Sequence, residues 1–205
     1  MEGPTLRVAI IIILPVFILF FSIQINFSSA DTNTQYVQAS CSNTTYPELC
    51  YSSLSCYARK IQRNPKTLAY VALNVTLTAT KSASEFIKTL YNNKLHGLKP
   101  KEAAAMADCV ELADEAVDEL ERSIGKMGRA RGSNSDPVIN DIQTWVSAAL
   151  TDDNTCMDGF SGDVLDGEVK SIVLKNMTQV AQLTSVALAL VNRFASSKGN
   201  SVLVL

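Results

Sequence analysis

The chain has 205 residues, of which 47% are hydrophobic and 19% are charged, and its formal net charge is −2. This length suits one domain or two small ones. The composition excludes a disordered acidic tail and a collagen-like fibre, and the balance of 18 basic against 20 acidic residues excludes a strongly basic nucleic-acid-binding protein.

The first 30 residues have the pattern of a secretory signal peptide. Residues 8–21 form an apolar run without a charge, and the small residues that end at Ala30 fit a signal-peptidase site. A membrane-spanning signal anchor is the alternative, but Pro15 and the polar residues after the run disfavour it. We therefore expect residues 1–30 to be removed and residues 31–205 to form a secreted domain without a stable membrane anchor.

Apolar residues in the remaining chain recur at intervals of three and four, which is the period of amphipathic helices. The first apolar stripe includes Ala83 and Phe86, and the last extends to Phe194. The four helical segments are residues 66–91, 101–124, 137–150 and 164–195. Clusters rich in Gly, Pro, Asn and Asp separate them and predict turns at residues 63–65, 92–100, 125–137 and 152–163.

Four amphipathic helices joined by short connections predict an all-α fold, an antiparallel up-and-down four-helix bundle over about residues 66–196. A further helical pattern with two cysteines precedes it and predicts an N-terminal helical hairpin over about residues 35–62. The last residues, 196–205, are expected to fray.

The cysteines are expected to form two disulfides, because a secreted protein folds in an oxidising compartment. Spacing alone does not decide their pairing. In an antiparallel bundle Cys109 and Cys156 lie at the same end, because each is about 22 Å from the intervening turn. Cys41 and Cys50 would then close the hairpin. Cys56 is left over and is expected to be a small buried hydrophobic residue, with an intermolecular disulfide as the alternative.

Three N-glycosylation sequons lie in the expected secreted part, at Asn43, Asn74 and Asn176. The helical period places Asn74 opposite the apolar stripe of its segment, where an oligosaccharide could be attached. Because such tripeptides also arise by chance, they support secretion without proving it.

The segment Asp108–Glu121 holds seven acidic residues among 14. At about 100° per residue, Glu111, Glu115 and Asp118 form one stripe on the helix face opposite Cys109. A run of this kind is most often a solvated face, and its outward position does not suit a buried catalytic pair of carboxylates. It does suit contact with a partner protein that carries basic groups.

The sequence offers little for catalysis or for binding a metal or cofactor. His96 is the single histidine and is expected to lie exposed in a loop. The motifs HExxH, P-loop and GxGxxG are absent, and cysteines committed to disulfides cannot bind zinc. We expect no catalytic residue, no metal, no cofactor and no nucleic-acid partner, and a hydrolase is the least favoured alternative.

Three segments together resemble the plant invertase and pectin methylesterase inhibitor family. They are CSNTTYPELC at residues 41–50, DCVELADEAVDEL at 108–120 and WVSAALTDDNTCMDGF at 145–160. The resemblance covers residues 40–194. It implies a four-helix bundle with an N-terminal hairpin, the disulfides Cys41–Cys50 and Cys109–Cys156, and a non-enzymatic protein that binds a secreted carbohydrate-active enzyme noncovalently and one to one.

The third segment resembles the pectin methylesterase inhibitor branch, and the Pro-Lys-Phe element typical of invertase inhibitors is absent between the second and third bundle helices. This resemblance implies that Glu111, Glu115, Asp118 and Thr155 contact the enzyme. Ala113 replaces an aromatic residue that is often found there.

We therefore predict an inhibitor that covers the substrate cleft of pectin methylesterase in the apoplast or cell wall, with invertase inhibition as the alternative. A pectin methylesterase pro-region would share the fold, but the printed residues show no catalytic domain after the bundle.

Overall fold

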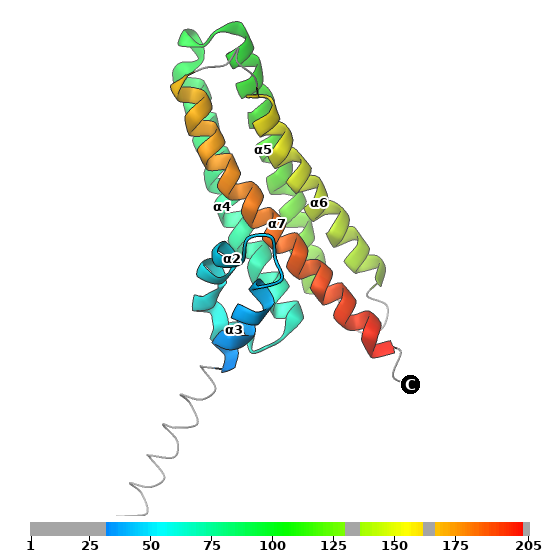
Figure 1. Ribbon diagram of the computed structural model, residues 1–205. Helices are drawn as coiled ribbons and strands as arrows, with labels where there is room; N and C mark the ends of the chain where they lie inside the picture. Colours follow the sequence, from blue (N-terminus) through cyan, green and yellow to red (C-terminus); the bar gives the residue numbers. More distant parts are fainter. Residues whose placement is uncertain (1–31, 130–135, 162–166, 203–205) are drawn as a thin grey trace, which may run out of the picture.

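The computed structural model describes residues 32–129, 136–161 and 167–202, and these residues are mostly helical. Four long helices dominate the molecule (Figure 1). They are α4 (Pro65–Lys94), α5 (Pro100–Arg129), α6 (Asp136–Asp158) and α7 (Glu168–Val202). Each helix packs against the next, and α7 also packs against α4, so the four helices close into a ring around a common core.

Contacts between neighbouring helices show that the bundle is antiparallel, as predicted. In every neighbouring pair, the residue numbers on one helix rise as those of their partners on the other helix fall. The contacts are Lys81–Glu121 and Lys88–Asp114 for α4 and α5, Cys109–Cys156 and Lys126–Asp141 for α5 and α6, Gln143–Asn192 and Asp153–Thr184 for α6 and α7, and Thr76–Leu183 and Lys94–Glu168 for α4 and α7.

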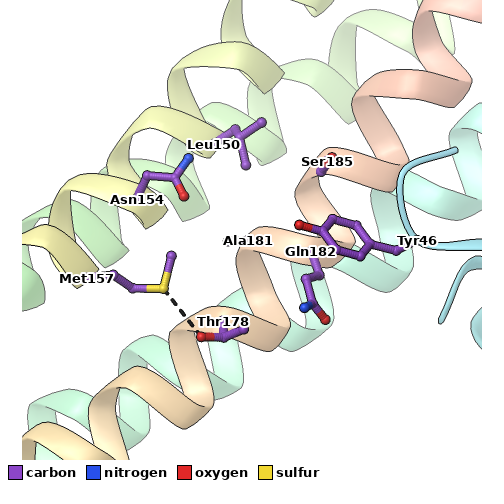
Figure 2. Close-up of a pocket in the computed structure, with 8 residues that line it drawn as sticks. All are labelled: Tyr46, Leu150, Asn154, Met157, Thr178, Ala181, Gln182 and Ser185. Carbon is purple, nitrogen blue, oxygen red and sulfur yellow. Dashed lines mark hydrogen bonds between the residues drawn. The ribbon is translucent and has the colours of Figure 1, made fainter.

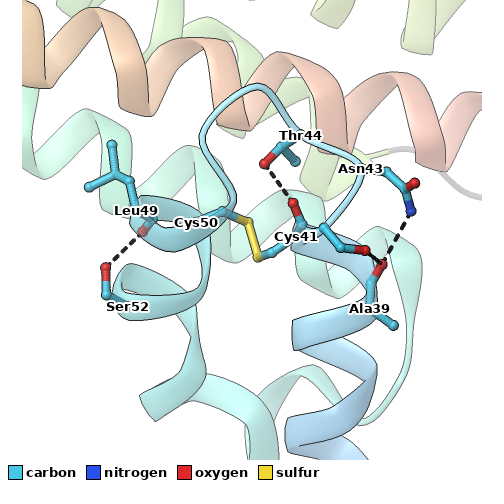
Figure 3. Close-up of a disulfide and its surroundings, with 8 residues drawn as sticks. Ala39, Cys41, Asn43, Thr44, Leu49, Cys50 and Ser52 are labelled. Carbon is cyan, nitrogen blue, oxygen red and sulfur yellow. Dashed lines mark hydrogen bonds between the residues drawn. A yellow bond between two sulfur atoms is a disulfide. The ribbon is translucent and has the colours of Figure 1, made fainter.

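The predicted N-terminal hairpin is confirmed and packs beside the start of α4. Its disulfide joins Cys41 to Cys50 with 5.5 Å between their Cα atoms (Figure 3). Beyond it the chain turns at Gln62 and Arg63, whose φ angles are 50° and 56°, and then enters α4. The elements of the hairpin are a helix over residues 32–41, α2 (Pro47–Leu54), the 3-10 turn η1 (Ser55–Tyr57) and α3 (Ala58–Ile61).

The apolar stripes predicted from the sequence form most of the core, with one clear error on α4. Leu68, Met106 and Ile142 are buried as expected. Phe86 was expected in the core, but 42% of its surface is exposed, and Ile87 is fully buried instead. Both residues continue the period that passes through Ala83, so the apolar pattern cannot distinguish them.

The predicted turn at residues 152–163 is wrong for its first half, because α6 continues to Asp158. Cys156 therefore lies inside the helix and not beyond its end. Both Asp153 and Cys156 are buried against the bundle, and this packing overrides the weak helix propensity of the Asp, Asn and Thr residues around them. The helix ends just before Gly159.

Two further boundaries differ from the predictions. α5 continues to Arg129 because Met127, in the predicted turn, is fully buried in the core. α7 continues to Val202, where fraying was expected from residue 196. The predicted signal peptide lies outside the described residues. Among the helices that are described, none combines the length and the apolar character needed to cross a membrane.

The fifth cysteine is not buried. Cys56 is a free, exposed cysteine in η1, so the prediction that it is a small buried hydrophobic residue is wrong. Its neighbour Tyr57 is also exposed, because this short 3-10 turn faces solvent. His96 is exposed, as predicted, within the 3-10 turn η2 (Leu95–Gly97).

Candidate functional site

The seam between α5 and α6 is fixed by a disulfide. Cys109 and Cys156 are buried, and their Cα atoms lie 4.5 Å apart. Thr155 precedes this cysteine and is exposed on α6, and its hydroxyl donates a hydrogen bond of 2.8 Å to the Thr151 carbonyl one turn earlier. The disulfide therefore holds Thr155 at a set height beside α5.

An acidic stripe, made of Glu111, Glu115 and Asp118, runs along the outer side of α5. All three residues are exposed, as the helical period predicts. No basic side chain in the described ranges lies within ion-pair distance of them. The described residues therefore leave their negative charge uncompensated.

Other acids of the same segment serve the fold. Asp114 accepts hydrogen bonds of 2.6 Å from the Ser84 hydroxyl and from the Lys88 ammonium group. Burial alone would raise the pKa of Asp114, but these two bonds outweigh it and hold that pKa below its usual value. Glu121 pairs with Lys81. The acidic segment thus has one face that ties α5 to α4 and another that faces solvent.

Asp152 of α6 adds a carboxyl group to this surface, and the sequence analysis did not identify it. Its burial, together with the charges of Glu115 and then Glu119 on α5, raises the pKa of Asp152 to about 6. Asp152 therefore faces the acidic stripe across the seam. It was missed because the local sequence predicted a turn there, and a turn would have separated it from α5.

Asp153, the next residue, points into the bundle. It is fully buried, and its Oδ2 atom accepts a hydrogen bond of 2.8 Å from the Thr184 hydroxyl of α7. Its Oδ1 atom has no hydrogen-bond partner among the described residues. Burial, opposed by the bond from Thr184 and assisted by the charge of Asp152, raises the pKa of Asp153 to about 7. Asp153 is a core residue and not part of the exposed surface.

The far end of the seam is neutralised. Lys126 pairs with Asp141 at 2.6 Å and lies 5.7 Å from the centre of the Trp145 ring. Because of this cation–π and ion-pair cluster, the unpaired carboxylates do not extend into the last turns of α5.

The seam has the character of a binding surface more than of a reaction centre. Its carboxylates lie on the outside of the helices. A catalytic acid–base pair instead needs a cleft whose environment makes the pKa values of the two groups differ. Within the described ranges, no three His, Cys, Asp or Glu side chains converge to hold a metal ion. Uncompensated charge on a rigid scaffold favours recognition of a complementary protein surface.

A family model described as "Plant invertase/pectin methylesterase inhibitor" matches residues 35–190 of the chain. The chain belongs to this inhibitor family. The match covers both the N-terminal hairpin and most of the bundle, which accords with the two disulfides that the structure places in those parts.

Individual proteins are also similar to this chain. The "21 kDa protein" of carrot, Daucus carota, is 46% identical over 82% of this chain and 88% of its own length. "Pectinesterase inhibitor 10" of Arabidopsis thaliana is 45% identical over 84% of this chain, which spans 55% of that longer protein. The crystal structure of mutant form A of a pectin methylesterase inhibitor from Arabidopsis superposes with a TM-score of 0.60 at 22% identity, over 74% of this chain and 92% of that one, and supports the fold.

The Tyr46-Pro47 pair that contributed to the family resemblance has a structural role. Pro47 occupies the start of α2, where its missing N–H costs no hydrogen bond. Tyr46 lies against α7 and borders a pocket of about 230 Å³ between α6 and α7. Figure 2 shows its ring beside Gln182 and Ser185. The pair therefore attaches the hairpin to the bundle, at a seam other than the one that bears the acidic stripe.

Proposed function

We propose that this protein is a secreted inhibitor of pectin methylesterase that binds the enzyme noncovalently and one to one. Family membership and the names of its relatives support an inhibitor, not an enzyme. Several of those relatives are named pectinesterase inhibitors, so inhibition of invertase is the less favoured alternative.

The observation that carries the proposed site is the uncompensated acidic stripe beside Thr155. Over the seven residue steps from Glu111 to Asp118, the rise of an α-helix spreads the carboxylates over about 10 Å. Pectin methylesterase acts on a methyl-esterified polymer of galacturonic acid and leaves free carboxylates on it, so a cleft that binds this polymer must tolerate or attract carboxylates. An acidic stripe on a rigid helix can occupy such a cleft and exclude the polymer.

Disulfide geometry supports this assignment physically. The Cys109–Cys156 bond restrains α5 from sliding against α6 and so holds the spacing of Glu111, Glu115 and Thr155. A surface organised in advance loses little conformational entropy when it binds. Inhibition by this seam therefore needs no change in the bundle.

The decisive experiment compares two target enzymes. The chain, secreted from a eukaryotic host and purified, is titrated into a plant pectin methylesterase and, in parallel, into a plant acid invertase at mildly acidic pH. We expect loss of esterase activity with a break at equal molar amounts and no loss of sucrose cleavage. Reduced and alkylated protein serves as the control. Full esterase activity at molar excess would refute the proposal, and loss of invertase activity alone would establish the alternative.

The same preparation tests secretion. Intact mass and N-terminal sequencing of the secreted protein should place the new N-terminus at Asp31, as the signal-peptide pattern predicts. Retention of residues 1–30 on a membrane-bound product would instead indicate a signal anchor.

A further inference from the structure

Phe86 is a large apolar side chain on the surface of α4. In the described residues, only Tyr57 and Phe86 are exposed large hydrophobic residues, with 40% and 42% of their surface accessible. A single exposed ring is ordinary on a protein surface. Phe86 is different because it stands at the side of a groove.

This groove lies between α4 and α7 and has a volume of about 340 Å³. The small side chains Ala79 and Ala83 leave room between the helices, and Val180 contributes another apolar wall. Its polar lining residues are Ser82, Asn176 and Gln179. No lining residue is charged, so the groove suits a neutral ligand that has both an apolar face and hydroxyl or amide groups.

Asn176 of this groove is also the first residue of a sequon, Asn176-Met177-Thr178. Its Nδ2 atom donates a hydrogen bond of 2.8 Å to the Ile172 carbonyl. A side-chain amide carries two N–H groups, so one can keep this bond while the other is replaced by a sugar. An oligosaccharide attached here would begin inside the groove.

We propose that Asn176 carries an N-linked oligosaccharide whose first N-acetylglucosamine lies in the α4/α7 groove, with its apolar face against the ring of Phe86. The donor is an oligosaccharide linked to a lipid diphosphate. A bond forms between Nδ2 and sugar carbon C1, the bond between C1 and the phosphate oxygen breaks, the amide loses one proton, and the lipid diphosphate leaves.

The chemistry of the sugar matches that of the groove. One face of a pyranose ring presents C–H groups, which pack on the electron-rich face of an aromatic ring. Its hydroxyl and acetamido groups can bond to Gln179 and Ser82. The sugar also covers apolar surface that α4 otherwise leaves in water.

The position of the groove is compatible with the proposed inhibitory surface. Because the helices form a ring in the order α4, α5, α6, α7, the α4/α7 seam lies on the side opposite the α5/α6 seam. An oligosaccharide on Asn176 would therefore leave the acidic stripe accessible. The inference rests on the secretion proposed above, because N-glycosylation takes place in the secretory pathway. It does not depend on inhibition, so an unmodified Asn176 and a failure to inhibit the enzyme are separate results.

A double-mutant cycle tests the inference with the full chain secreted from a eukaryotic host. Glycopeptide mass spectrometry first measures occupancy of Asn176. Unfolding equilibria are then compared for the native chain, Phe86→Ser, Asn176→Gln and the double variant. We expect Phe86→Ser to lower the folding equilibrium constant about threefold to tenfold more in the glycosylated chain than in the Asn176→Gln background.

Two controls make the cycle specific. Thr178→Ala abolishes the sequon but leaves the Asn176 side chain in place, and it should reproduce the effect of Asn176→Gln. Asn74→Gln removes another half-buried sequon on α4 that does not line the groove, and it should be additive with Phe86→Ser. An unmodified Asn176, or additive effects of Phe86→Ser and Asn176→Gln, would overturn the proposal.

Discussion

The buried carboxyl group of Asp153 makes the stability of the bundle depend on pH. An isolated Asp titrates near pH 3.8, whereas burial raises the pKa of Asp153 in the folded protein to about 7. Between these two values the folded state binds a proton that the unfolded state has released. The protonated carboxyl is stable in the core because it carries no charge and can still accept the hydrogen bond from the Thr184 hydroxyl.

We therefore predict that Asp153 makes the free energy of unfolding fall as the pH rises from about 4 to about 7. The contribution of Asp153 is complete below about pH 4 and is lost as the pH approaches about 7, with a total on the order of 4 kcal/mol. Denaturant unfolding at several pH values measures it. Asp153→Asn keeps the size of the side chain and removes the titration, so its unfolding free energy should vary less over this range.

A matched variant distinguishes the core residue from its neighbour. Asp152→Asn changes a half-buried group at the seam and should alter the pH dependence of stability less than Asp153→Asn does. An equal pH dependence of unfolding in the native chain and in Asp153→Asn would show that Asp153 is ionised in the folded protein.

The acidic stripe acts through the arrangement of its three carboxylates along α5. Reversal of all three charges, by Glu111→Lys, Glu115→Lys and Asp118→Lys, should weaken inhibition of pectin methylesterase by about tenfold to a hundredfold. The physical reason is that the enzyme surface, which is complementary to three carboxylates, would instead meet three ammonium groups and repel them. The measurement is the inhibition constant at two salt concentrations, because screening should reduce the difference.

The control for this triple variant changes the same net charge elsewhere. Glu48→Lys, Glu85→Lys and Glu168→Lys alter three exposed acids on α2, α4 and α7. Inhibition should stay close to that of the native chain. Equal losses in the two triple variants would mean that net charge, and not the stripe, governs binding.

The two disulfides stabilise different elements and should contribute unequally. Cys109 and Cys156 are separated by 47 residues in sequence, whereas Cys41 and Cys50 are separated by nine. By loop-closure entropy, removal of the first by paired Cys→Ala changes should cost about 4 kcal/mol of unfolding free energy, and removal of the second about 2.7 kcal/mol. Denaturant titration of the two double variants measures both. The reverse order would contradict an entropic origin.

The helices were largely predictable from sequence, and the exceptions have physical causes. Apolar periodicity found the core face of α5, where Met106, Cys109 and Leu120 are buried. It could not find the end of α6, because burial of Asp153 depends on α7, which is distant in sequence. For the same reason Asp152 was assigned to a turn and not to the surface beside Glu115.

At the scale of the whole molecule, the ring of four helices separates two surfaces. The α5/α6 seam carries the acidic stripe, and the α4/α7 seam carries the groove with Asn176. Sequence predicted both the stripe and the sequon, but not that they lie on opposite sides. That arrangement follows from which helices are neighbours, and periodicity within one helix does not contain this information.

This separation predicts opposite effects of an oligosaccharide at the two seams. Glu115→Asn with Val117→Thr creates a new sequon on α5, at an exposed and a half-buried position. An oligosaccharide there would stand between the stripe and the enzyme, so inhibition should fall by about a hundredfold or more.

The same variant made in a host that does not glycosylate should lose only the small contribution of Glu115. Asn176→Gln, by contrast, should leave the inhibition constant unchanged. Undiminished inhibition by the chain glycosylated at position 115 would place the enzyme-binding surface elsewhere on the bundle.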